Sequence, residues 1–506
     1  MNCMETNETV KIGMIALGCN KNQVDAELML GALEKEGFEI VENAAECDVV
    51  IVNTCGFIES AKRESIENIL ECCQLKEKGY VKLVVVTGCL AERYREEMAE
   101  LIPEADVILG IGANDEIAAS IRQALEGQKV RKFYAPENLE MEGKRILVNY
   151  PYYAYIRIAD GCDNRCSYCA IPAIRGRYRS RPMENIVEEC KAFAEKGVEE
   201  FIIIAQDTTR YGEDIYGKRM LPELLRKICK IDGIRWIRIL YAYPERVTEE
   251  LLDVMASEEK IVKYLDIPLQ HCSKKVLKAM HRKQSTPAEL VAMVKHLRER
   301  VPGITLRTTL LTGFPGETEE DFNELCEWVK TMKFERMGAF AYSEEEGTYA
   351  AKHYIDDIPQ EEKDAFEAMS QAESDASSEK EEITEPVSEK NGTTNNYFRL
   401  YSETKNVDYN IAATLRISDS RAIKRLSLRA ACILYLVCIL VSISASMPNA
   451  ASKQRARASV TGRFPFSISF NIEYDTPICC DSTFCDMPLY SISSFITSPG
   501  CVGVYG

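Results

Sequence analysis

The chain has 506 residues, with 79 acidic side chains against 62 basic ones and a formal net charge of -17. This length predicts roughly two to four domains, and an apolar fraction of 46% excludes wholesale disorder. The negative charge argues against DNA binding through a basic surface. Residues 1–9 are polar, and the apolar run 12–17 is too short for a signal-peptide core. The 20 cysteines therefore predict metal or redox chemistry in the cytoplasm rather than a disulfide framework.

Residues 1–127 are expected to form an open parallel α/β sheet domain. Short β-rich runs alternate there with helix-patterned stretches of the length that a parallel crossover requires. The expected strands are 11–17, 48–53 and 82–87, and the expected helices are 23–36, 59–78 and a further helix from residue 91.

A second alternating series occupies residues 148–365, after a charged and polar stretch, 128–147, that is expected to be a linker. Its expected strands are 152–158, 201–205, 234–240, 264–267, 304–310 and 337–342. A repeated strand–helix alternation of this kind predicts a barrel-like (β/α) array, whose reactive face is formed by the loops at the carboxyl ends of the strands.

Residues 366–506 differ in composition from the rest of the chain. Residues 366–398 include a serine-, glutamate- and lysine-rich run that predicts a disordered linker. Residues 430–446 are uncharged and could form an apolar helix, at the short end for a membrane span. We favour the alternative of an aberrant tail, from a shifted reading frame or a fusion, and we do not expect a membrane partner.

Three cysteines lie close together on one expected loop. Cys162, Cys166 and Cys169 follow the strand 152–158. Three thiolates on so tight a loop can bind three irons of a 4Fe–4S cluster and leave the fourth iron open for reaction. Zinc is the alternative, but it prefers four ligands, and no second cysteine or histidine pair stands nearby in the sequence.

Three further cysteines each come just after an expected strand of the first series. Cys19, Cys55 and Cys89 follow the runs 11–17, 48–53 and 82–87. Because the carboxyl ends of parallel strands share one edge of a sheet, these thiols are expected to converge and could bind a second three-thiolate cluster. Any one of them alone would more often be a buried small apolar side chain.

Other candidate ligand contacts come from the second series. Gln206 follows the strand 201–205. Gly313 and Gly316 belong to a segment after the strand 304–310 that could approach a ligand by its backbone or be a plain turn. Tyr168 could pack on a flat ligand or be a core aromatic. Glu200 could anchor an amine or be a solvated strand start.

These residues carry a resemblance to a known family. The segment 162–169, CDNRCSYC, resembles the cluster-binding motif of radical S-adenosylmethionine (SAM) enzymes. Together with Cys19, Cys55 and Cys89 it is similar to the methylthiotransferase family, and the likeness runs from residue 11 to 363. The phrases that place it nearest to the protein-modifying branch are LGCNKNQVDAE (17–27), NTCGFI (53–58), QDTTRYG (206–212), LDIPLQH (265–271) and YSEEEGT (342–348).

The resemblance implies two 4Fe–4S clusters and SAM as cofactors. It implies that the cysteines of the 162–169 loop bind the cluster that cleaves SAM to a 5′-deoxyadenosyl radical, and that the other three bind an auxiliary cluster that supplies sulfur. The implied reaction adds a methylthio group to the β-carbon of an aspartate in ribosomal small-subunit protein 12, with a flavodoxin- or ferredoxin-type electron donor. A tRNA (adenosine) methylthiotransferase of the same family is the alternative.

One departure from the family concerns the end of the chain. The family normally ends in a small β-barrel, the TRAM domain, which helps to hold the substrate. Here residues 366–506 stand in its place, so a TRAM-less inactive product is a further alternative. The expected fold is thus an α/β sheet domain, a partial TIM-type radical SAM barrel and an atypical tail.

Overall fold

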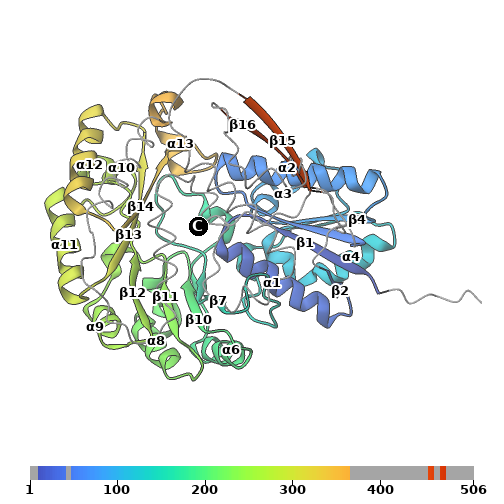
Figure 1. Ribbon diagram of the computed structural model, residues 1–506, viewed down its shortest axis with the longest axis horizontal. Helices are drawn as coiled ribbons and strands as arrows, with labels where there is room; N and C mark the ends of the chain where they lie inside the picture. The colour runs from blue at the N-terminus through green and yellow to red at the C-terminus, as the bar shows by residue number, and fades with distance from the viewer. Residues whose placement is uncertain (1–8, 42–46, 365–453, 461–467, 475–506) are drawn as a thin grey trace, which may run out of the picture. The chain divides into compact units, whose positions relative to one another are not determined.

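Two six-stranded parallel sheets dominate residues 9–364 of the protein (Figure 1). The structure is a computed structural model that describes residues 9–41, 47–364 and the two strands 454–460 and 468–474. By its contacts the chain divides into two compact units, 1–382 and 383–506. Both sheets belong to the first unit.

The first sheet has the strand order β2-β1-β3-β4-β5-β6. Its strands are β1 (Lys11–Ala16), β2 (Glu39–Ile40), β3 (Val49–Thr54), β4 (Leu83–Gly88), β5 (Val107–Leu109) and β6 (Val130–Lys132). All neighbours are parallel, with Ile12 opposite Val49 and Val49 opposite Leu83. The order reverses between β1 and β3, and in open parallel sheets ligands bind beyond the carboxyl ends of the strands at such a point.

Helices cover both faces of this sheet, as a sheet buried on both sides requires. Helices α1 (Asn20–Lys35) and α4 (Ile117–Leu125) share one apolar core with the sheet. Helices α2 (Glu59–Glu77) and α3 (Cys89–Leu101) share a second core with the opposite face. Strands β3 and β4 are buried at every position, which explains their continuous Val- and Ile-rich sequences.

The second sheet is an incomplete (β/α) barrel with the order β14-β13-β12-β11-β10-β7. Its strands are β7 (Tyr153–Arg157), β10 (Glu200–Ile204), β11 (Trp236–Ile239), β12 (Ile261–Asp266), β13 (Thr305–Thr312) and β14 (Arg336–Ala341). The longer helices between them are α6 (Met183–Glu195), α8 (Leu221–Cys229), α9 (Glu249–Ser257), α11 (Pro287–Arg300) and α12 (Glu319–Met332). Residues from these helices and from alternate strand positions form the largest apolar core among the described residues.

Short elements lie at the carboxyl ends of the barrel strands, where they shape the loops. They are β8 (Ala159–Asp160), β9 (Arg179–Ser180), α5 (Ile171–Arg175), α7 (Glu213–Tyr216), α10 (Lys274–Ala279) and α13 (Tyr349–His353). The 3-10 turns are η2 (Ile111–Glu116), η3 (Pro136–Asn138), η4 (Thr208–Arg210) and η5 (Pro244–Arg246).

The expected α/β class and the order of sheet domain and barrel are confirmed. The stretch 128–147, which was expected to be a linker, begins with β6, so the first sheet extends into it. The end of this stretch packs on α1, where Arg145 donates to the Glu27 carboxylate within a buried pair.

In the second unit the structure describes one antiparallel pair, β15 (Gln454–Val460) and β16 (Ile468–Tyr474). The expected linker 366–398 and apolar helix 430–446 lie outside the described residues. In the part of the chain that the structure describes, no helix is both long and apolar enough to span a membrane.

Candidate iron–sulfur and radical SAM site

The first group of thiols lies at the carboxyl edge of the N-terminal sheet. Cys19 immediately precedes α1, Cys55 directly follows β3, and Cys89 directly follows β4. Because β1, β3 and β4 are parallel neighbours, these segments meet at the point where the strand order reverses. A Cβ atom on Gly18 would come within 2.9 Å of the Cys55 Sγ, so the loops that carry Cys19 and Cys55 are in contact.

The electrostatic influence of these three thiols on one another also indicates that they lie close together. Burial raises the pKa of Cys89 to about 12 despite the nearby Arg175, and the Cys19 and Cys55 thiols contribute to the rise. Burial likewise raises the pKa of Cys55, and Cys19 adds to that shift. Cys55 and Cys89 therefore keep their protons at neutral pH until a metal displaces them, as it does at thiolate sites.

The second group of thiols is on the loop between β8 and α5. The backbone N–H of Cys162 donates to the Gly176 carbonyl at 3.1 Å. The Ser167 N–H donates to the Met280 carbonyl at 3.0 Å, and the Ser167 carbonyl accepts from the Ala350 N–H at 2.7 Å. Segments far apart in sequence thus hold this loop in one conformation.

Burial is the main influence on the pKa values of two thiols in this loop. It raises the pKa of Cys162 to about 11 and also raises the pKa of Cys169. The Arg282 Nη1 donates a hydrogen bond to the Cys166 Sγ at 3.9 Å. A guanidinium beside the sulfurs would stabilise them once they are deprotonated.

Both groups fit a 4Fe–4S cluster by the chemistry of their donors. All six cysteines are free thiols. In residues 9–41 and 47–364, no three Cys, His, Asp or Glu side chains are arranged to hold a single metal ion. A cubic cluster does not require such convergence, because each of its irons takes its own thiolate at a separate corner.

The structure places Tyr168 in an aromatic cluster beside the second group of thiols. Its ring meets the Phe314 ring edge-on, with the centroids 6.5 Å apart. Its hydroxyl lies beside the Cys166 sulfur, and burial raises its pKa well above the ordinary tyrosine value. The contact between the Tyr168 and Phe314 rings is the packing that the core-aromatic alternative predicts.

Gln206 and the glycine turn both lie at the carboxyl edge of the barrel. The Gln206 Nε2 donates to the Asp160 Oδ1 at 2.8 Å, while its buried Oε1 has no hydrogen-bond partner. Gly313 has a φ of +69°, and a Cβ there would meet the Lys363 side chain at 2.4 Å, so packing explains this glycine. Gly316 has a φ of +81° with open space around it, as in a turn.

The structure does not bring Glu200 to this edge. Glu200 is the first residue of β10, so it lies at the amino end of the strand, and the loops that carry the thiols lie at the other end. Its Oε1 accepts from the Arg238 Nε at 2.9 Å. The strand direction, which the sequence already implied, separates it from the expected cofactor.

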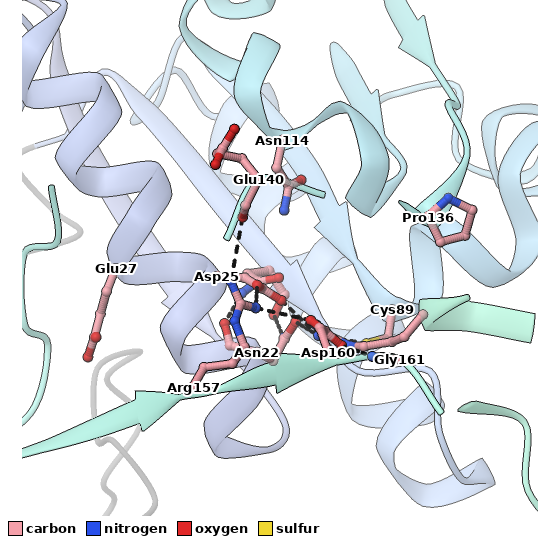
Figure 2. Close-up of polar contacts among 12 residues, drawn as sticks. Asn22, Asp25, Glu27, Cys89, Asn114, Pro136, Glu140, Arg157, Asp160 and Gly161 are labelled. Carbon is pink, nitrogen blue, oxygen red and sulfur yellow. Dashed lines mark hydrogen bonds and ion pairs between the residues drawn. The ribbon is translucent and has the colours of Figure 1, made fainter. Parts of the chain in front are cut away.

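A buried ion cluster that the sequence analysis missed lies between Cys89 of the first group of thiols and Asp160, which precedes the loop of the second group (Figure 2). The Arg175 guanidinium forms an ion pair with the Asp25 carboxylate at 2.8 Å. It donates hydrogen bonds to the Asp160 carboxylate at 2.9 Å and to the Cys89 Sγ at 3.5 Å. Arg157 pairs with the same two carboxylates. Burial would raise the pKa of Asp160, but the two arginines lower it to about 2.

A second contact joins the N-terminal sheet to the far side of the barrel. Glu345, in the loop after β14, pairs with Arg93 at 2.7 Å and with Lys62 at 3.2 Å. The two cations come from α3 and α2, and the Glu345 side chain is only 4% exposed. The N-terminal sheet is thus attached near both the first and the last strand of the barrel.

Comparison with known proteins agrees with this architecture. Residues 156–329 match the radical SAM superfamily, and residues 11–110 match the uncharacterized protein family UPF0004. The structure resembles the radical S-adenosylmethionine methyltransferase TsrM from Kitasatospora setae with a TM-score of 0.50 and 18% identity, over 66% of this chain and 75% of that chain. The fold and the cysteine loop thus define a radical SAM protein.

Sequence relatives place it within that class. It is 52% identical to the ribosomal protein uS12 methylthiotransferase RimO of Lachnoclostridium phytofermentans, over 68% of this chain and 78% of the relative. It is 51% identical to the protein of the same name from Clostridium tetani, over 68% of this chain and 77% of the relative. The chain belongs to the RimO family of radical SAM methylthiotransferases, which use two 4Fe–4S clusters and SAM.

Proposed function

We propose that this chain adds a methylthio group to the β-carbon of an aspartate in ribosomal protein uS12, in the cytoplasm. The observation that carries the proposal is the pair of three-thiol groups at the facing edges of two parallel sheets, connected through Arg175. An unactivated C–H bond calls for a radical rather than a general base. When bound, the cofactors supply that radical, the sulfur and the methyl group.

We assign the six cysteines by their positions. Cys162, Cys166 and Cys169 bind the cluster that chelates SAM, and their loop is held by the backbone bonds around Ser167. The other three, which follow β1, β3 and β4, bind the auxiliary cluster. Tyr168, which packs against Phe314, borders the site of the SAM-binding cluster, and Gln206 offers its unpartnered amide oxygen toward SAM.

We further propose domain boundaries and an electron donor. Residues 1–127 with the strand β6 form the auxiliary-cluster domain, and residues 148–365 form the radical SAM domain. A flavodoxin- or ferredoxin-type protein delivers the electron that SAM cleavage consumes.

The test uses the full chain, reconstituted with iron and sulfide without oxygen and supplied with SAM and a low-potential reductant. Small ribosomal subunits and tRNA are offered together, and peptides and nucleosides are read by mass spectrometry. A methylthio group on uS12 supports the proposal. Methylthio nucleosides would support the tRNA alternative, and 5′-deoxyadenosine without either product would indicate a radical centre that has lost its substrate.

A further inference from the structure

Lys21 is a buried cation that neither the thiol groups nor the buried ion cluster uses. It lies two residues after Cys19 in the first turn of α1 and is only 7% exposed. None of the ion pairs formed by the described residues includes it. Its ammonium instead lies 3.0 Å from the centroid of the Tyr241 ring, which comes from the barrel. A buried ammonium without a carboxylate is costly, because a ring face compensates only part of the lost hydration.

Tyr241 is itself held in an unusual conformation. It follows β11 with a φ of +59°, a region that non-glycine residues rarely adopt. Two contacts fix it there: the Asn20 amide donates to its hydroxyl at 3.2 Å, and its own N–H donates to the Asp266 Oδ2 at 3.2 Å. Backbone strain of this kind persists where the surrounding structure imposes it, and it concentrates at ligand sites.

One buried carboxylate, Asp266, lies within the electrostatic reach of Lys21. Asp266, at the end of β12, is 2% exposed, and its Oδ1 has no hydrogen-bond partner. The Arg307 guanidinium lies 3.9 Å from that oxygen. Lys21 acts on this carboxylate only through its electrostatic field and forms no ion pair with it, so an anion that enters the barrel mouth would meet an ammonium that has no carboxylate partner among the described residues.

We propose that Lys21 binds the side-chain carboxylate of the target aspartate at the barrel mouth. This inference rests on the proposed function and names the residue that recognises its substrate. The carboxyl carbon is bonded directly to the β-carbon, so an ion pair at the carboxylate also orients the C–H bond that reacts. Tyr241 acts as a positioning residue, because its ring face contacts the ammonium of Lys21.

The inference predicts discrimination between aspartate and asparagine. An asparagine amide matches the shape of the carboxylate but carries no charge, so it cannot replace the charge-assisted hydrogen bond. Loss of such a bond is expected to weaken binding about 10- to 100-fold.

Binding is measured with the full chain, loaded with its clusters and SAM, by the fluorescence anisotropy of a labelled uS12 peptide. One peptide carries the target aspartate and a second carries asparagine in its place. The wild type should prefer the aspartate peptide about 10- to 100-fold. Lys21→Gln should bind the two peptides about equally, and Lys21→Arg should retain a preference. The matched control is Lys295→Gln, because the Lys295 side chain is 75% exposed on α11.

The outcomes separate this inference from the proposed function. A wild type without preference, a Lys21→Gln protein that keeps it, or a Lys21→Arg protein that loses it would each overturn the role of Lys21. Iron content, measured on the same samples, shows whether a variant has kept its fold and clusters. A wild type that prefers the aspartate peptide but forms no methylthio product would refute the proposed function alone.

Discussion

Replacing Arg175 by methionine removes the guanidinium that connects the two halves of the site. Met has a similar length but no charge, so Asp25 and Asp160 would be left to share Arg157. The pKa of Asp160 is lowered from 3.8 to about 2, which corresponds to about 2 kcal/mol of net stabilisation, because the two arginines and the hydrogen bonds from Gly161 and Gln206 outweigh the cost of burial. Breaking a buried ion pair by removing one partner costs about 3–5 kcal/mol. Because Arg157 remains, we expect the lower end, about 3 kcal/mol.

The assay is thermal unfolding of the cluster-loaded protein without oxygen, followed by circular dichroism. A loss of about 3 kcal/mol lowers the midpoint by about 6 °C in a domain of this size. The matched control is Arg226→Met, whose 43% exposed side chain pairs with Glu250 at the surface and contributes less than about 1 kcal/mol. If Arg175→Met unfolds at the same temperature as this control, the buried ion cluster does not hold the two domains together.

Four more predictions follow from the site. Cys166→Ala should abolish 5′-deoxyadenosine production, measured by chromatography, and unchanged turnover would remove the radical assignment. Cys55→Ala should spare that production but stop sulfur insertion, and a fully modified product would contradict the auxiliary-cluster role. Glu345→Gln removes the only carboxylate that Arg93 pairs with among the described residues, while Lys62 keeps its pair with Glu59, so it should lower the unfolding midpoint by several degrees; an unchanged midpoint would show that this contact adds nothing. The carboxylate of Asp160 has a pKa lowered to about 2, so its stabilisation is present above pH 4 and is lost as the pH falls from about 4 to about 2. In Asp160→Asn, the free energy of unfolding should therefore depend less on pH between about 4 and about 2. The same pH dependence as in the wild type would refute this assignment.

The sequence predicted the elements whose patterns are local. Strands β1, β3 and β4 are continuous apolar runs, and each was placed within one residue of its observed end. The convergence of the cysteines after them followed from parallel pairing alone. Strands β2, β5 and β6 were missed because two or three residues carry no periodicity, and their pairing depends on neighbours far away in the chain.

The buried charges could not be predicted in this way. Arg157 and Asp160 stand in an otherwise apolar run, which is a local signal that a charge is buried, but the sequence does not reveal which partner satisfies it. Their partners Asp25 and Arg175 lie far from them or on another element. Lys21 has no local signal at all, because its environment is created by Tyr241, more than two hundred residues away.

The net charge of the chain acts over the protein surface and the ammonium of Lys21 acts locally in the barrel mouth, and both favour a protein substrate over RNA. The net charge of -17 gives the chain an acidic field that opposes docking of a polyanion, whose affinity depends on neutralising its phosphates. At physiological ionic strength that field falls off over about 8 Å. The buried ammonium of Lys21 is screened much less, so it can attract one carboxylate that enters the barrel mouth even though the outer surface is acidic. In a ribosomal protein that presents basic residues around a single aspartate, the basic residues would be attracted by the acidic surface and the aspartate by Lys21. Raising the salt concentration should accordingly weaken overall peptide binding more than it weakens the preference for aspartate over asparagine, and an equal loss of both would place the discriminating charge at the exposed surface instead.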